Sequence, residues 1–142
     1  MAKLDPIIQR KIMRYCAYQE RCTSEVEHKL RVLGCPPSQV SVYLCYLNAE
    51  DFLKEARYTE VFVRGKVKNN KWGPRKIELA LMAKKVPHSL IRKELEHFNA
   101  QWPKLEVYWT DRMTKAWAHK SYDSFMLQGK LRVFLRQKGF YV

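Results

Sequence analysis

The residues best able to do chemistry are basic side chains concentrated in the middle of the chain. Between Arg64 and Lys85 there are eight basic residues and a single acid, Glu78. Lysine and arginine bind phosphate or carboxylate by charge attraction and counterion release, and arginine adds bidentate geometry. Each lysine alone is typical of a solvated helix face, but together they predict a surface for a polyanion. Its basic members are Arg64, Lys66, Lys68, Lys71, Arg75, Lys76, Lys84 and Lys85.

A second basic stretch lies further on, with Asp123 as its only acid. In a curved array of repeats, basic residues of neighbouring units can line one concave face. We therefore expect this stretch to extend the same surface. The stretch carries Arg112, Lys115, Lys120, Lys130, Arg132, Arg136 and Lys138, of which Lys130, Arg132, Arg136 and Lys138 are assigned to the predicted surface.

Trp72 stands among the charges of the first stretch. An aromatic ring there could stack on a base or anchor a protein contact. It could equally pack beneath its own loop. Both interpretations stay open, and Trp72 is kept with the predicted surface.

Catalytic motifs are absent from the sequence: it has no glycine-rich phosphate loop, no His-Glu-x-x-His and no nucleophile elbow. His28 and His97 fall on polar helical positions, which favours simple solvation over general-base work. We expect no enzyme activity, no cofactor and no small-molecule substrate.

The four cysteines lie in the first third of the chain, at spacings that match no zinc-binding pattern. Free cysteine usually behaves as a small buried hydrophobe. We therefore expect Cys16, Cys22, Cys35 and Cys45 to pack in cores, with no metal site.

Composition predicts a folded helical protein with an anionic partner. Hydrophobic residues make up 46% of the 142 residues, and the net charge is +13. No apolar run reaches the roughly 18 residues of a membrane span, and the first residues lack the core of a signal peptide. We expect a soluble, cytoplasmic protein with no membrane contact.

Helix signals divide the first third into three short helices. Asp5-Pro6 is typical of a capped helix start, and Ser24 with Glu27 predicts a capping box for a second helix. Gly34 would end that helix, and Pro36-Pro37 would open a third. Further along, the stretch from Asn69 to Pro74 is expected to be a loop before another helix.

The same pattern returns at a fixed offset. Adding 51 to six apolar positions of the first unit gives six apolar positions of a second. Val26, Leu30, Cys35, Val40, Leu44 and Leu47 correspond to Ile77, Leu81, Val86, Ile91, Leu95 and Phe98.

Adding 105 instead places a third copy of the second helix at Leu131 to Phe140, so the last helix of that copy is missing. We predict an all-α, elongated and curved array of three-helix repeats at 1–48, 51–99 and 102–142, the third incomplete. Either this copy lacks a helix that its relatives have, which would expose Leu131, Leu135 and Phe140, or it closes in a different way.

These repeats resemble the RecX family of regulators of the bacterial recombinase RecA. The resemblance runs from about Ile12 to the end of the chain. One departure is Lys85, where the family usually has glycine, so the preceding helix is expected to be capped without a left-handed glycine. The matching segments are Thr23–Leu30 with Gly34, Arg57-Tyr58, Phe62–Arg64, Trp72–Ile77 and Lys130–Phe140.

The resemblance implies a protein that binds RecA and RecA–DNA filaments and inhibits or modulates recombinase activity in DNA repair and the SOS response. DNA itself would be bound weakly and without sequence specificity. The alternative is a general basic helical protein that binds DNA or RNA mainly through phosphate.

Overall fold

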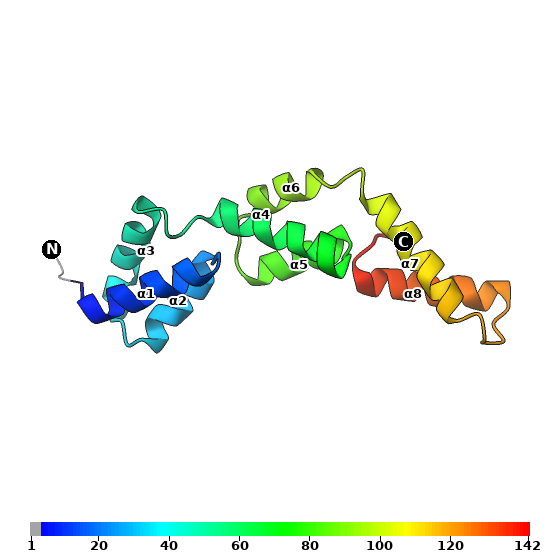
Figure 1. Ribbon diagram of the computed structural model, residues 1–142, viewed down its shortest axis with the longest axis horizontal. Helices are drawn as coiled ribbons and strands as arrows, with labels where there is room; N and C mark the ends of the chain where they lie inside the picture. Colours follow the sequence, from blue (N-terminus) through cyan, green and yellow to red (C-terminus); the bar gives the residue numbers. More distant parts are fainter. Residues whose placement is uncertain (1–3) are drawn as a thin grey trace.

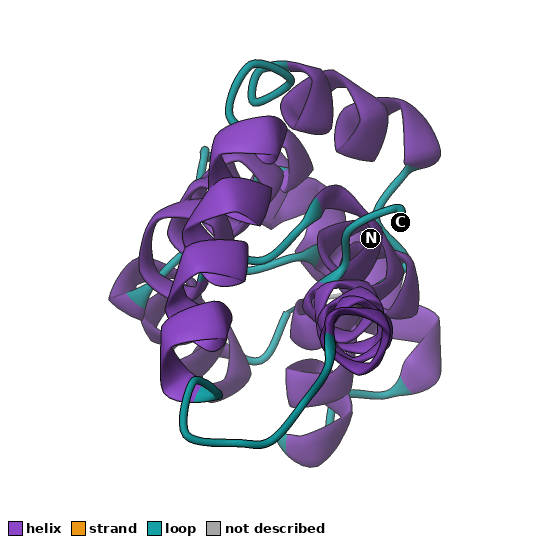
Figure 2. Cartoon of the chain, turned by 90° about the vertical axis from the view of Figure 1, so that its right-hand side faces the viewer, coloured by secondary structure: helices purple, strands orange, loops and turns teal. Residues whose placement is uncertain are grey.

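A computed structural model describes residues 4–142; residues 1–3, which open the N-terminal segment considered above, lie outside it. The described part contains eight α-helices and no β-strand (Figure 2), which confirms the predicted all-α class. The helices succeed one another along an elongated molecule (Figure 1). Their bounds are α1 Pro6–Tyr18, α2 Thr23–Val32, α3 Val40–Ala49, α4 Glu55–Gly65, α5 Pro74–Ala83, α6 His88–Glu96, α7 Trp102–Ala116 and α8 Ser124–Lys138. None of these helices is both long and apolar enough to cross a membrane.

The first unit, α1–α3, packs around its own core. Ile12, Leu30 and Tyr43 are completely buried there. Asp5 caps α1 by accepting a hydrogen bond from the Ile7 N–H at 2.8 Å, as predicted. Gly34 follows α2 in the left-handed region at φ +84°, also as predicted, which lets the chain turn toward α3.

The predicted capping box at the start of α2 is wrong by two residues. Cys22 precedes the helix, and the Glu25 carboxylate accepts a hydrogen bond from the Cys22 N–H at 3.1 Å. Ser24 lies inside the first turn, where its hydroxyl donates to the Lys84 carbonyl at 2.7 Å. The serine therefore joins two units instead of capping its own helix.

The middle unit, α4–α6, has a second core around Val63, Ile77 and Ile91. A π-helical turn, Lys66–Asn70, continues α4 into the stretch that we expected to be a loop. The loop expected from Asn69 is thus shorter than predicted, since only residues 71–73 separate this turn from α5.

The third unit consists of α7 and α8, and it buries the residues that a missing helix would expose. Leu131, Leu135 and Phe140 are only 6%, 8% and 3% exposed, which agrees with the alternative that this copy closes in a different way. Trp109 packs edge-on against Phe134 between the two helices. The end of α8 also contacts the middle unit, where the Gly73 N–H donates to the Lys138 carbonyl.

Helix α3 ends at Ala49, just past the first predicted range. The ranges as separate domains stay a prediction. Cys22, from the first range, is completely buried in the core of the middle unit. The units therefore share core residues.

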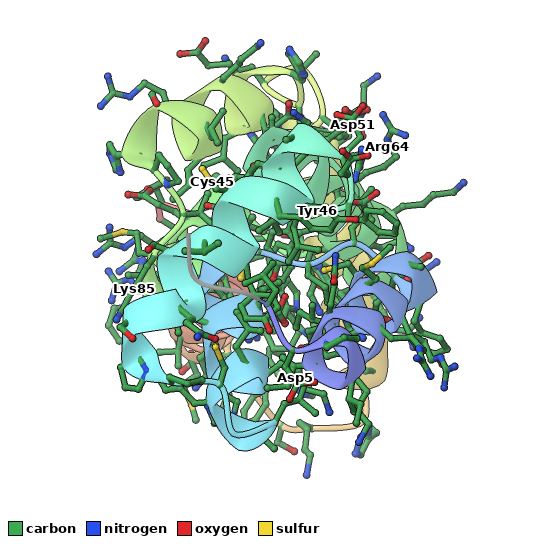
Figure 3. The ribbon with its side chains drawn as sticks, turned by 90° about the vertical axis from the view of Figure 1, so that its left-hand side faces the viewer. Asp5, Cys45, Tyr46, Asp51, Arg64 and Lys85 are labelled. Carbon is green, nitrogen blue, oxygen red and sulfur yellow. The ribbon has the colours of Figure 1, made fainter. Side chains whose placement is uncertain are left out.

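The cysteine prediction is confirmed for three thiols and wrong for the fourth. Cys16, Cys22 and Cys35 are buried, whereas Cys45 is exposed on α3 (Figure 3). Burial raises the pKa of the Cys16 thiol to about 11, so this thiol stays protonated at neutral pH.

Candidate polyanion-binding surface

The end of α8 meets the beginning of α5 head to tail. The N–H groups of Gly73 and Arg75 donate to the carbonyls of Lys138 and Gly139 at 2.7 and 2.9 Å. The first N–H groups and the last carbonyl groups of a helix have no hydrogen-bond partner within the helix. This contact provides partners for carbonyls at the end of α8 and for N–H groups at the start of α5, and it aligns the dipoles of the two helices. Figure 1 shows α8 and α5 following one another along the molecule.

Two glycines allow this close approach. A Cβ atom on Gly73 would lie 2.5 Å from the backbone of Gly139, a distance that no packing tolerates. Gly139 itself has φ +103°, and a Cβ there would lie 2.5 Å from the Lys76 Cβ. The position of α8 relative to α5 therefore depends on both glycines.

Trp109 fixes the loop at residues 71–73, which precedes α5. Its indole N–H donates to the Lys71 carbonyl at 2.8 Å, while Lys71 holds a left-handed conformation at φ +53°. Tyr141 adds a second tie, since its hydroxyl donates to the Glu78 carboxylate at 3.3 Å. Glu78, the only acid of the first basic stretch, thus contacts the third unit.

Three lysine ammonium groups cover the aromatic side chains of this contact. The Nζ atoms of Lys66 and Lys76 lie 4.6 and 4.4 Å from the centroid of the Trp72 ring. The Lys138 Nζ lies 4.4 Å from the centroid of the Trp109 ring. We call Lys66, Lys76 and Lys138, with the two tryptophans, the lysine junction.

Trp72 combines features of both interpretations left open above. Its ring packs against the core of the middle unit and is half-buried. The two ammonium groups above it are held by cation–π attraction. The ring therefore orients Lys66 and Lys76, and direct stacking on a base is not needed for its place in the site.

The lysine junction carries positive charge without compensation. No carboxylate in residues 4–142 lies within ion-pair distance of its three lysines. Desolvation, followed by the charges of Lys138 and Lys66, lowers the pKa of Lys76. A bound anion would relieve this repulsion.

The contact between the first and middle units shows the compensated version of the same arrangement. There the Lys84 ammonium, just after α5, pairs with Glu25, the third residue of α2, at 3.4 Å. Lys76 is likewise the third residue of α5, and Lys138 ends α8. Glu25 in the contact between the first and middle units thus corresponds to Lys76 in the lysine junction, where a lysine stands in place of the acid.

The structure separates several residues that the sequence places together. Arg64 pairs with Glu60 at 2.7 Å, and Lys84 with Glu25. Figure 3, a view from the left-hand end, shows Arg64 and Lys85 on opposite sides of the molecule. Arg64 and Lys84 are therefore paired with acids, unlike the three lysines of the junction.

The remaining predicted residues lie around the junction or along α8. Lys71 sits in the loop with its Nζ 5.0 Å from the centroid of the Tyr108 ring, and Lys68 and Arg75 are exposed nearby in the chain. On α8, Arg132 is exposed, Lys130 lies over Tyr122, and Arg136 donates to the Val142 carbonyl at 3.0 Å.

Trp109 is not among the residues that the sequence singles out. Its bond to Lys71 joins different units, and local periodicity contains no signal for such a contact. The basic and aromatic face of α1, also missed, was visible as Lys11, Arg14, Tyr15 and Tyr18 at helical spacing.

Comparison with known proteins agrees with this architecture. Residues 55–95 match the second three-helix domain of RecX. The chain is 30% identical over 137 residues to regulatory protein RecX of Pseudomonas syringae pv. tomato, covering 94% of this chain and 83% of that protein. The chain belongs to the RecX family. It is therefore a member of a family of regulatory proteins.

Other RecX proteins extend the comparison. Regulatory protein RecX of Pseudomonas fluorescens is 27% identical, with 98% of this chain and 88% of that protein covered. The crystal structure of RecX from Lactobacillus salivarius superposes with a TM-score of 0.83 at 26% identity, covering 94% of this chain and 86% of that one. A second RecX crystal structure, at 21% identity and a TM-score of 0.84, shares the fold.

Proposed function

We propose that this RecX-family protein regulates RecA by binding RecA and the RecA–DNA filament, with the lysine junction contacting an anionic part of the filament. The observation that carries the proposal is the convergence of Lys66, Lys76 and Lys138 without an acid. Uncompensated charge of one sign attracts a partner of the other sign and steers its approach. Membership of the RecX family supports RecA as that partner.

Binding would inhibit or modulate recombinase activity in DNA repair and the SOS response. Both constituents of the filament offer suitable anions, namely DNA phosphates and protein carboxylates. The junction also joins the middle and third units, so an anion there would strengthen their contact. The proposed role is binding alone, without a catalytic step, cofactor or small-molecule substrate.

The proposal is tested with Lys76→Glu, which should recreate at this junction the pair formed by Glu25 and Lys84. The substitution keeps α8 docked but lowers the net charge of the three junction positions from +3 to +1. We expect the concentration that half-inhibits the DNA-dependent ATPase of RecA to rise roughly tenfold or more. Lys93→Glu on α6 is the matched control, because Lys93 is exposed and undergoes the same change of charge.

Two results would contradict the proposal. One is a folded parent protein, added below the concentration of RecA, that leaves its ATPase and strand-exchange activities unchanged. The other is equal inhibition by Lys76→Glu and the parent protein. Circular dichroism of each variant establishes that the helices are retained.

General binding of DNA or RNA is the second candidate, favoured by the tryptophans beside the junction lysines. A salt series separates the two functions. Binding through phosphates alone weakens steeply with salt, by a slope of about 0.7–0.9 per contact on logarithmic axes. A contact specific to RecA should retain affinity at salt concentrations that abolish binding to free DNA.

A further inference from the structure

A groove on the first unit combines basic and aromatic side chains. It lies between α1 and α2 and has a volume of about 340 Å³. No acidic residue lines it. The lining residues are Lys11, Arg14, Tyr15, Tyr18, Arg21, Lys29 and Leu33. We call it the N-terminal groove.

Arg21 is held flat against an aromatic ring in this groove. Its guanidinium carbon lies 3.7 Å from the centroid of the Tyr15 ring, and its Nε donates to the Tyr15 carbonyl at 3.0 Å. The Lys29 ammonium lies 5.5 Å from the same centroid. The planar surface therefore exists before any partner arrives, which limits the entropy lost on binding.

Tyr18 provides an aromatic ring that the protein itself does not cover. The residue is 81% exposed, and its ring centroid lies 5.9 Å from the Arg21 guanidinium carbon. Exposed aromatic rings beside arginine are typical of surfaces that bind bases or proteins.

The positive charge of the N-terminal groove is not neutralised by neighbouring acids. Its four basic side chains form no ion pair within the described part of the chain. The acids near it in sequence are engaged elsewhere: Glu20 pairs with Arg57, Glu25 with Lys84 and Glu27 with Arg31.

Single-stranded nucleic acid matches these features. Bases without a pairing partner stack on tyrosine rings and arginine planes, while lysine and arginine bind the phosphates. Bases of a duplex are already stacked and cannot enter. The groove volume lies at the lower end of the roughly 300–1,000 Å³ typical of small-ligand pockets, which suits a single nucleotide. An acidic peptide would satisfy the charges but leave Tyr18 without a role.

We infer that the N-terminal groove binds an unpaired nucleotide of a single-stranded nucleic acid, with its base on Tyr18 or the Tyr15–Arg21 plane and its phosphates on Lys11 and Arg14. Arg21 of the groove and Trp72 of the middle unit each lie in the segment that joins the first and second helices of their unit. The groove goes beyond the proposed function, because it is formed within the first unit and requires no RecA.

The test measures fluorescence anisotropy of a labelled oligothymidine with the full chain and no recombinase. Tyr18→Ala should weaken binding roughly tenfold, the order expected for one lost stacking contact. Tyr18→Phe keeps the ring and should bind like the parent protein. The exposure of Tyr18 means that neither substitution disturbs the core.

Charge is tested separately with Lys11→Glu and Arg14→Glu together. The matched control is Arg10→Glu with Lys93→Glu, which makes the same change of net charge at exposed positions outside the groove. We expect the first pair to weaken oligothymidine binding at least tenfold more than the second. Tyr18→Ala should have little effect on the affinity for a duplex of equal length.

The inference is overturned if Tyr18→Ala binds oligothymidine like the parent protein, or if both charge-reversed pairs weaken binding equally. It is also overturned if poly-glutamate displaces oligothymidine while Tyr18→Ala has no effect, since the groove would then be an acidic-peptide site. Inhibition of RecA by the Lys76→Glu variant reports on the lysine junction, so failure of either proposal can be recognised separately.

Discussion

Left-handed backbone at residues other than glycine marks places where a side chain is retained despite strain. Asp51, Lys71 and Lys85 have φ between +53° and +60° in the described part of the chain. At Lys71 the carbonyl accepts the Trp109 indole N–H, so the unusual conformation contributes to the lysine junction. The Lys85 side chain, in contrast, is exposed and forms no hydrogen bond or ion pair in the structure.

Lys85→Gly should therefore stabilise the protein. A left-handed conformation costs a residue with a Cβ atom about 1–2 kcal/mol, partly offset by the greater freedom of glycine in the unfolded chain. We expect a net gain of about 1 kcal/mol in the free energy of unfolding, measured by urea denaturation. Lys85→Ala removes the same charge but keeps the strain, so it should show no comparable gain.

A gain of equal size in both variants would mean that charge, and not backbone strain, limits stability at this position. The same comparison tests the expectation that α5 ends without a left-handed glycine. The structure confirms that glycine is absent but shows that the left-handed conformation itself is retained by lysine.

Contacts between helix ends hold the elements in a row. The carbonyls at the end of α8 accept from the first N–H groups of α5, and the Lys84 carbonyl after α5 accepts from Ser24 of α2. In both contacts, the C-terminal end of one unit's second helix thus meets the N-terminal end of the second helix in the preceding unit. The hydrogen bonds between α8 and α5 join backbone atoms, so that contact depends on close backbone approach.

Gly73→Ala should separate the third unit from the middle one. The added methyl group would lie 2.5 Å from the Gly139 backbone, which cannot move without breaking the two hydrogen bonds between α8 and α5. We expect faster amide hydrogen exchange at positions 73 and 75, whose N–H groups donate the two hydrogen bonds, and a lower free energy of unfolding, by roughly 1–3 kcal/mol. The core of the first unit should keep its protection.

Gly129→Ala provides the control within α8. No atom lies within 4 Å of the added Cβ, and alanine favours helix over glycine, so stability should rise by about 0.5–1 kcal/mol. If Gly73→Ala behaved in the same way, close backbone approach would not be what holds the third unit.

Local signals predicted helices well and contacts between units poorly. Asp5 and Gly34 mark helix ends because their effect is confined to neighbouring residues. Ser24 was misassigned because its hydroxyl bonds to Lys84, a residue of another unit. For the same reason the lysine junction could not be derived, since charge counting along the chain does not bring Lys76 beside Lys138 or separate Arg64 from them.

At the scale of the whole molecule, the row of units exposes much more surface than a compact fold. Two buried cores are shared among the three groups of helices in the described part of the chain. The N-terminal groove belongs to the first unit and the lysine junction to the contact between the middle and third units, so the two basic sites lie on different units along the long axis (Figure 1). Such a shape allows contact with several subunits of a filament at once, which raises the effective concentration of each contact. The proposed regulation of RecA is consistent with this geometry.

Small-angle X-ray scattering tests this shape directly. A compact domain of 142 residues would have a radius of gyration of about 14–15 Å. We expect a clearly larger value for the parent protein, because its units are arranged in a row with narrow contacts between them. Gly73→Ala should increase it further by freeing α7 and α8, whereas Gly129→Ala should not. A value near 15 Å in all three proteins would show that the units fold back on one another in solution.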